Sequence, residues 1–325
     1  MRVLVTGANG FVGSSLCKTL SGRGYFVRAA VRSMEKSFSP ADAMECIQVG
    51  EIGPNTDWAV ALRGIDVVAH LASRVHIMRD ASTNPSDDYR RVNIEGTRTL
   101  AEAAVKAGVS RCIFLSTIKV SGEQTTDRAF VETDISPKMD PYSISKNEAE
   151  LALNSIADKL GLEVVIIRPP LVYGPGVKAN FLRLIDMVNK NIPLPLSLVR
   201  NKRSMIYVGN LTDAIIKCIE HKSAANKTFL ISDGQDISTS ELIKMIAKAM
   251  GKKPSLLPLP PSLIKALGKL AGKSLEVDRL VGSLRVDSTK IRKMLGWKPP
   301  FTIEEGISET VRWYMDMNKD ATKRG

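Results

Sequence analysis

The chain has 325 residues, of which 44% are hydrophobic and 25% are charged. This composition is typical of a globular protein with one large core, or of a large domain with a smaller lobe. No stretch approaches the roughly 18–20 apolar residues of a membrane span, and nothing at the N-terminus resembles a signal peptide. The four cysteines are scattered, without a Cys-x-x-Cys pair. We therefore expect reduced thiols, no membrane span and a cytoplasmic protein.

The formal net charge of +12 indicates three candidate partners: nucleic acid, anionic lipid and phosphorylated small molecules. The basic residues are spread along the chain, and no basic run is interleaved with aromatic residues as in single-strand binders. We therefore expect no nucleic-acid binding and favour a phosphorylated small molecule. The three histidines lie too far apart in the sequence to suggest a metal site.

The first half of the chain alternates short β-branched runs with helical patterns, as in a parallel sheet covered by helices on both faces. The predicted strands are 2–6, 26–31, 65–71, 112–116 and 163–168. The predicted helices are 14–23, 89–107 and 142–160. Beyond about residue 170, proline-punctuated loops separate shorter helices. We predict a dinucleotide-binding domain in 1–170 and a mainly substrate-binding lobe in 171–325, from which strands could return to the sheet.

Three glycines at intervals of three residues follow the first predicted strand, and a helix is predicted after them. Glycine permits a tight turn and lets backbone N–H groups approach a pyrophosphate at a helix N-terminus. The position between an apolar strand and a helix favours this interpretation over an ordinary strand-to-helix turn. The predicted cofactor contacts here are Gly7, Gly10, Phe11, Val12 and Gly13.

The end of the second predicted strand bears on the choice between NAD and NADP. An acidic residue there binds the ribose 2′-hydroxyl of NAD, whereas an arginine accommodates the 2′-phosphate of NADP. Val31 stands about where the acid is expected, and Arg32 is beside it. This mildly favours NADP over NAD, although Arg32 could also be a solvent-exposed cation. Glu51 and Ile52 are weaker candidates, expected to flank the adenine.

Tyr142 and Lys146 lie four residues apart at the start of a predicted helix, and Pro141 precedes them. Residues at this spacing share one helix face, so the ammonium can sit near the phenol. A phenol with a pKa near 10 is a poor base at neutral pH, and a nearby cation favours the phenolate. The pattern also occurs as a surface pair, but its place after the strand at 112–116 favours proton transfer. Lys146 could also hydrogen-bond the nicotinamide ribose.

These motifs occur in the order found in one enzyme family. The other matching segments are His70-Leu71-Ala72, Val92-Asn93-Ile94-Glu95-Gly96-Thr97, Phe114-Leu115-Ser116-Thr117, Arg168-Pro169-Pro170 and Leu295-Gly296-Trp297-Lys298-Pro299. Over nearly its whole length the chain resembles the extended short-chain dehydrogenases/reductases, in the NAD-dependent epimerase/dehydratase group. Within it, the chain is most similar to UDP-glucose 4-epimerase-like proteins of bacterial polysaccharide loci. The resemblance implies a Rossmann-type doubly wound parallel sheet with a smaller mixed C-terminal lobe, and a homodimer formed through the helices near Thr97 and Tyr142.

The resemblance also implies residue roles. Thr117 matches the catalytic hydroxyl, which hydrogen-bonds the reacting sugar oxygen and acts with Tyr142 and Lys146. Three further residues are expected at the cofactor: Leu71, Ala72 and Pro169. Asn180 and Arg203 match positions that hold the phosphates of a sugar nucleotide, a task to which an arginine fork is suited. Two more substrate candidates, which could reach or shape the sugar pocket, are Arg74 and Lys119.

Three functions are compatible with these features. The first is an NAD(P)-dependent 4-epimerase of a UDP-hexose or UDP-N-acetylhexosamine. The second is an NADPH-dependent 4-keto reductase of a UDP-4-keto-6-deoxy-N-acetylhexosamine, which the presence of Arg32 favours. The third is a non-catalytic dinucleotide-sensing protein on the same fold. A sensor has no use for a proton-transfer pair, so the presence of Thr117, Tyr142 and Lys146 together argues against it.

Residues 263–270 have an apolar stripe at helical spacing, with Lys265, Lys269 and Lys273 on another face. The commoner interpretation, which we favour, is an amphipathic helix that covers the substrate lobe. The alternative is a helix that lies on an anionic membrane. We keep this alternative because some proteins that the chain resembles handle lipid-linked sugars.

Overall fold

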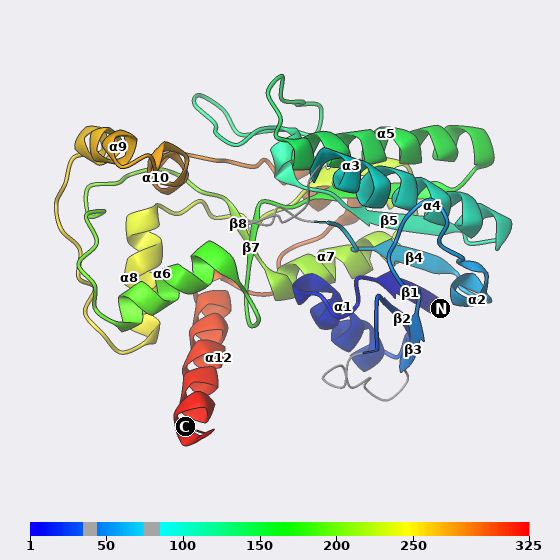
Figure 1. The fold of residues 1–325 in the computed structure, drawn as a ribbon, viewed down its shortest axis with the longest axis horizontal. Helices are drawn as coiled ribbons and strands as arrows, with labels where there is room; N and C mark the ends of the chain where they lie inside the picture. The colour runs from blue at the N-terminus through cyan, green and yellow to red at the C-terminus, as the bar shows by residue number, and fades with distance from the viewer. Residues whose placement is uncertain (35–43, 75–84, 325) are drawn as a thin grey trace.

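The computed structural model describes residues 1–34, 44–74 and 85–324. A seven-stranded sheet with the order β3-β2-β1-β4-β5-β6-β9 lies at the right of Figure 1, and all its neighbouring strands are parallel. The strands are β1 (Arg2–Thr6), β2 (Phe26–Val31), β3 (Met44–Gln48), β4 (Val67–His70), β5 (Arg111–Leu115), β6 (Glu163–Arg168) and β9 (Lys227–Leu230). This order confirms the predicted Rossmann-type doubly wound α/β fold.

Helices cover both faces of the sheet. Alternate residues of β1 pack against different sets of these helices. Val3 and Val5 pack in a buried cluster with residues of α1 (Phe11–Gly22) and α7 (Val208–Glu220). Leu4, which points to the opposite face, packs in a second cluster with residues of α4 (Gly96–Lys106) and α5 (Pro141–Leu160). A strand buried on both faces needs an apolar residue at every position, which is why this run was recognisable in the sequence.

The predicted boundaries of β1, β2 and β6 are confirmed, whereas several helix starts differ. α1 begins at Phe11, three residues before the predicted start, because the glycine turn leads directly into the helix with Gly10 as its N-cap. The helix predicted at 89–107 consists of a π-helical segment, η1 (Arg90–Glu95), continued by α4. Two short helices complete this half, α2 (Ala59–Leu62) and α3 (Pro85–Tyr89).

The second half of the chain builds a lobe beside the sheet, at the left of Figure 1. β7 (Leu171–Tyr173) and β8 (Met205–Tyr207) form a two-stranded parallel sheet. The lobe helices are α6 (Ala179–Asn189), α8 (Thr239–Ala249), α9 (Pro261–Leu270), α10 (Ser274–Val281) and α12 (Ile303–Arg324). Short segments connect these parts: η2 (Ile118–Val120), η3 (Lys222–Ala224) and α11 (Thr289–Leu295). β9 and α7 return to the main sheet, so its core uses residues from both halves of the sequence.

Two global features bear on the sequence expectations. Among the described helices, none combines the length and the apolar composition that crossing a bilayer requires. All four cysteines are described and free, and Cys17, Cys112 and Cys218 are buried. Burial raises the pKa of each of these three thiols to about 12, so they are unreactive core residues.

Candidate active site at the carboxyl edge of the sheet

A cleft of about 610 Å³ opens at the carboxyl ends of β1, β2 and β4. The strand order reverses between β1 and β4, and α/β folds bind nucleotides at such a switch point. Twelve of the residues predicted from the sequence line this cleft: Gly7, Gly10, Phe11, Val12, Gly13, Arg32, Glu51, Ile52, Leu71, Ala72, Arg74 and Tyr142. The structure therefore brings the glycine turn, the end of β2 and the tyrosine together.

The glycine turn has no room for side chains. Gly7 has a φ of +67°, and a Cβ added to it would lie 2.9 Å from the backbone of Ala72. A Cβ on Gly13 would lie only 2.1 Å from the carbonyl oxygen of Gly7. α1 begins at Phe11, and its N-cap Gly10 provides no side-chain cap; the first turn contains no acidic residue. A bare helix N-terminus of this kind fits the pyrophosphate of a dinucleotide.

A buried chain of hydrogen bonds holds the end of β4 against this turn. The hydroxyl of Thr6 lies 2.7 Å from Nδ1 of His70, and Nε2 of His70 lies 2.9 Å from the hydroxyl of Thr97. The backbone N–H of Ala72 donates to the Thr6 hydroxyl. Burial, together with the charge of Lys146, lowers the pKa of His70 to about 3, so the ring is neutral. His70 is thus a structural residue that fixes one wall of the cleft.

Asn93 joins three parts of the site from the π-helical segment η1. Its Oδ1 accepts from the Ser73 hydroxyl at 3.0 Å and from the backbone N–H of Arg74 at 2.8 Å. Its Nδ2 donates to the Ser145 hydroxyl, one turn along α5 from Tyr142. π-Helical segments are frequent at functional sites. The sequence alone gives Asn93 no role, although it stands in a recognised motif, because its partners are far away along the chain.

Tyr142 reaches the cleft from the first turn of α5. Asp140 is the N-cap of this helix, and its carboxylate accepts from the backbone N–H of Ser143 at 2.7 Å. The Tyr142 phenol is hydrogen-bonded to Ser73, and its ring packs edge-on against Tyr89. Burial raises the pKa of Tyr142 to about 12, the bond to Ser73 opposes this shift, and the charge of Asp140 adds to it. In the protein alone, the phenol is therefore protonated at neutral pH.

Lys146 lies one helical turn further along α5 and is buried. Its Nζ lies 3.9 Å from the ring centroid of Phe114, a cation–π distance. Burial lowers the pKa of Lys146 to about 7, and the carboxylate of Glu150 opposes the shift. Tyr142 and Lys146 are thus shifted in opposite directions from ordinary values, as is common for a proton-transfer pair.

Two predicted residues shape the loop after β5 without lining the cleft. Thr117 caps η2, and its hydroxyl accepts from the backbone N–H of Lys119 at 3.3 Å. Pro169 is buried, and its carbonyl accepts from the backbone N–H of Ile118 at 2.9 Å. Ser116, the neighbour of Thr117, does line the cleft. Its hydroxyl donates to Glu150, which forms a buried ion pair with Arg168 at 2.6 Å.

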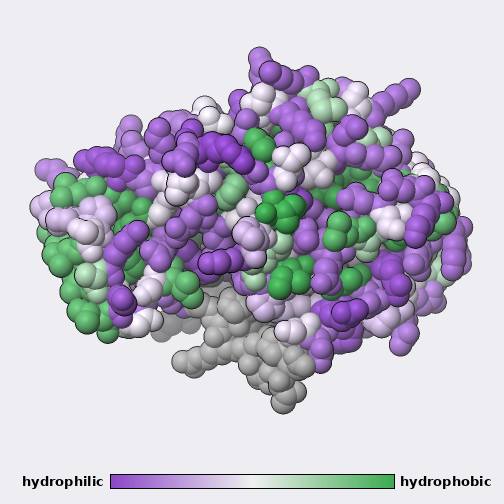
Figure 2. All heavy atoms as spheres, turned by 90° about the horizontal axis from the view of Figure 1, so that it is seen from above, coloured by the Kyte–Doolittle hydropathy of each residue, from purple (hydrophilic) through white to green (hydrophobic). Residues whose placement is uncertain are grey.

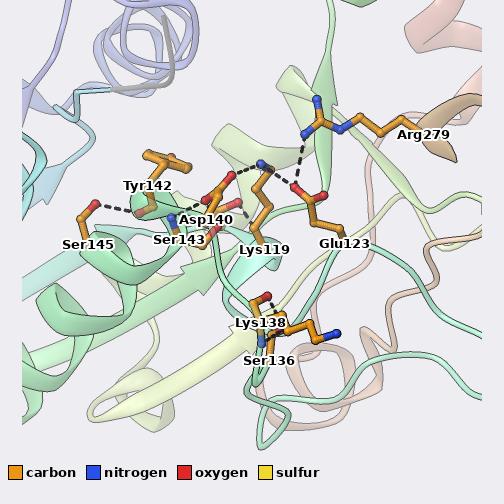
Figure 3. A network of polar contacts seen from close by, with 10 residues as sticks. Lys119, Glu123, Ser136, Lys138, Asp140, Tyr142, Ser143, Ser145 and Arg279 are labelled. Carbon is orange, nitrogen blue, oxygen red and sulfur yellow. Dashed lines mark hydrogen bonds and ion pairs between the residues drawn. The ribbon is translucent and has the colours of Figure 1, made fainter. Parts of the chain in front are cut away.

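The substrate candidates have different environments. Lys119 lies between the carboxylates of Asp140, at 2.6 Å, and Glu123, at 2.7 Å, and Glu123 in turn contacts Arg279 of α10 (Figure 3). The Arg203 guanidinium donates to the carbonyls of Arg279 and Gly282, so it contacts the same helix.

The other two candidates lie elsewhere. Arg74 forms an ion pair with Asp88 at 3.1 Å at the edge of the cleft. Asn180 is exposed in the first turn of α6. The structure therefore places Arg203 against α10 and connects Lys119 to that helix only through Glu123, whereas Arg74 borders the cofactor cleft. The role of each in substrate binding stays a prediction.

The fold and the site together define a dinucleotide-binding α/β enzyme with a Tyr-x-x-x-Lys pair. Residues 3–232 match the NAD dependent epimerase/dehydratase family, and the chain belongs to this family. This confirms the family expected from the motifs.

Three individual similarities extend this finding. The chain is 45% identical over 319 residues to a UDP-glucose 4-epimerase of Vibrio cholerae, covering 97% of this chain and 96% of that protein. It is 28% identical to the N-acetyl-α-D-glucosaminyl-diphospho-ditrans,octacis-undecaprenol 4-epimerase of Escherichia coli O157:H7. This similarity covers 98% of this chain and 97% of that protein. The solved structure of MoeE5 in complex with UDP-glucose and NAD has a TM-score of 0.77 at 25% identity, covering 98% of this chain and 100% of that chain.

Proposed function

We propose that this protein is a nicotinamide-dependent 4-epimerase of a UDP-hexose or UDP-N-acetylhexosamine. The observation that carries the proposal is the position of Tyr142 in the same cleft as the glycine turn, with Lys146 buried one turn behind it. The similarity to a UDP-glucose 4-epimerase along nearly the whole of both chains supports the substrate class. The fold alone would not support a substrate class, because this fold serves many activities.

In this proposal, the chain's residues manage one proton at the sugar C4 hydroxyl. Tyr142 as phenolate removes that proton, Thr117 hydrogen-bonds the same oxygen, and Lys146 stabilises the phenolate. When bound, the oxidised nicotinamide would accept the C4 hydride and add a positive charge that favours the phenolate. Tyr142 then returns the proton when the hydride comes back to the other face of the 4-ketosugar. Moving one proton from the Tyr142 phenol to the Lys146 amine forms the phenolate and the ammonium. This transfer leaves the net charge of the pair unchanged.

The cofactor is a nicotinamide dinucleotide, and the end of β2 bears on which one. Arg32 lines the cleft and is exposed, and the neighbouring Val31 offers no carboxylate to a ribose 2′-hydroxyl. This arrangement favours NADP, whereas the family name and the MoeE5 complex favour NAD. Arg32 is therefore also the observation that supports the second candidate function, an NADPH-dependent 4-keto reductase.

A homodimer through α4 and α5 is part of the proposal. Ile144 and Leu151, seven residues apart on α5, are exposed apolar side chains on one helix face, and Leu160 is exposed at its end. Light scattering on the purified protein would test this interface, with Leu151→Lys expected to give monomers. An unchanged oligomer in that variant would reject it. A cytoplasmic location and the division of labour between 1–170 and 171–325 also remain proposals.

The proposed function can be tested by denaturing the purified protein and identifying any released nicotinamide. The protein is then given UDP-sugars with and without NADPH. Tyr142→Phe should lose about 10²–10⁴ in kcat while keeping its cofactor, because only the proton-transfer group is removed. If Tyr142→Phe left every activity intact, the catalytic assignment would be wrong and the non-catalytic sensor would become the better account.

A further inference from the structure

The outer tip of the lobe carries an apolar surface that the described residues leave uncovered. Leu263, Leu267 and Leu270 are 45%, 51% and 86% exposed, and all three belong to α9. Leu275, in the first turn of α10, is 68% exposed. Hydrophobic atoms accordingly gather at the left end of Figure 2, the end at which α9 lies in Figure 1. Contiguous exposed apolar side chains usually mark an interaction surface.

The packing of α9 explains why these leucines face outward. Ile264 and Gly268, four residues apart, are the buried residues of the helix. Gly268 sits so close to α10 that an added Cβ would lie 2.5 Å from Val277. Positions 263, 267 and 270 are i, i+4 and i+7 on a different face, which points away from this contact. α9 therefore covers the lobe as we expected, but only through the narrow face that Ile264 and Gly268 form.

Lysines follow the exposed leucines along the same segment. Lys265, Lys269 and Lys273 recur at intervals of four residues and are exposed. Lys265 lies 3.8 Å from Asp278, while Lys269 and Lys273 form no ion pair among the described residues. Glu276 and Asp278 are the acidic residues of α10. The whole chain has a formal net charge of +12.

We propose that Leu263, Leu267, Leu270 and Leu275, together with Lys265, Lys269 and Lys273 of the same segment, dock this protein on an anionic lipid bilayer. An interfacial helix inserts its apolar side chains at the headgroup boundary, and flanking lysines contact anionic headgroups through flexible stems. A second copy of this chain is a poorer occupant, because a two-fold contact would bring the same lysines face to face. The proposal does not depend on the proposed function, since it concerns a surface outside the cofactor cleft.

The test is co-sedimentation of the full chain with vesicles of phosphatidylcholine, with and without phosphatidylglycerol. We expect binding to the mixed vesicles only. Lys269→Gln with Lys273→Gln should weaken the partition coefficient roughly thirtyfold, at about one kcal/mol for each lysine near an anionic surface. Leu267→Ser with Leu270→Ser should weaken it at least about tenfold. A matched control is Val60→Ser with Met317→Ser, two exposed apolar residues on α2 and α12, which should bind like the unmodified chain.

Three results would overturn the proposal. The first is no sedimentation with mixed vesicles, and the second is equal binding of the lysine variant and the unmodified chain. The third is a smaller oligomer for the leucine variant in light scattering without vesicles, which would assign the surface to a second copy. Circular dichroism checks folding, and the lysine variant decides the matter if the leucine variant does not fold. Turnover of a water-soluble UDP-sugar should be the same in all variants.

Discussion

The Nζ of Lys119 lies 2.6 Å from Oδ2 of Asp140, which ties the loop after β5 to the first turn of α5. Asp140 caps that helix two residues before Tyr142, and its negative charge adds to the raised pKa of the tyrosine. Burial opposes ionisation of Asp140, but its bonds to Lys119 and Ser143 outweigh this and lower its pKa. Lys119 therefore compensates a charge that would otherwise act fully on the phenol.

Replacing Lys119 should shift the pH dependence of catalysis. In Lys119→Met the uncompensated carboxylate raises the pKa of Tyr142 further, so the acid limb of the kcat profile moves to higher pH. At neutral pH we expect kcat to fall about five- to tenfold. Asp140→Asn, which keeps the helix cap, should move the same limb to lower pH. A uniform loss of kcat with unchanged limbs in both variants would contradict this electrostatic link.

Burial of Lys146 should appear as a pH-dependent cost in stability. Its pKa falls from the ordinary 10.5 to about 7. Between these values the unfolded chain binds more protons than the folded chain, so the contribution of this group to stability rises with pH. Lys146→Met should therefore raise the free energy of unfolding at pH 7 by about 2 kcal/mol, and this gain should shrink towards pH 10.5.

Urea unfolding of the cofactor-free protein across this pH range measures the effect of Lys146→Met. The same variant should lose activity, which separates stability from function. If Lys146→Met is less stable than the unmodified protein at pH 7, the ammonium makes net favourable contacts in the folded state. In that case the burial argument is wrong.

The buried pair of Arg168 and Glu150 should be a major support of the site. Both side chains are at most 5% exposed, and Arg168 also donates to the carbonyls of Glu132 and Asp134. Arg168→Met leaves the Glu150 carboxylate buried without its cation, so we expect a loss of about 3–5 kcal/mol in the free energy of unfolding. The double variant with Glu150→Leu should recover part of this loss. Urea titrations of the unmodified protein, the single variant and the double variant measure these free energies of unfolding. A loss below about 1 kcal/mol in Arg168→Met would show that water reaches the pair.

The glycine turn offers a matched pair of substitutions within one helix. A Cβ at Gly13 would collide with the Gly7 carbonyl, whereas a Cβ at Gly22 would meet nothing within 4 Å. Gly13→Ala should weaken dinucleotide binding at least about tenfold, because the turn must open. Gly22→Ala should bind normally and be about 0.5–1 kcal/mol more stable. Calorimetric titration with NAD and NADP gives the affinities, and equal binding by both variants would exclude the turn as the pyrophosphate site.

Much of the sheet could be predicted because its strands are buried on both faces and therefore continuously apolar. β3 could not, since Met44–Gln48 is an edge strand with partly exposed side chains and no strong pattern. β9 was anticipated only as a possible return to the sheet. Its pairing with β6 joins residues more than sixty positions apart, and local patterns carry no information about such pairings.

The site shows the same division between local and distant information. Tyr142, Lys146 and the glycines were recognisable because their chemistry depends on short spacings within one turn or helix. Asn93 and Glu150 were not assigned roles, because their importance comes from Ser73, Ser145 and Arg168, which only the fold brings near. Lys119 was predicted to shape the sugar pocket, and its two carboxylate partners became visible only in the structure.

The most direct test of the central claim is to follow UDP-glucose and UDP-galactose by proton NMR in the presence of the purified protein. As a 4-epimerase, the protein should interconvert them, or the corresponding N-acetylhexosamine pair, without net consumption of added nicotinamide. Tyr142→Phe should slow the exchange about 10²–10⁴-fold. Oxidation of NADPH only when a UDP-4-ketosugar is supplied, with no interconversion of either pair, would contradict the epimerase and establish the reductase.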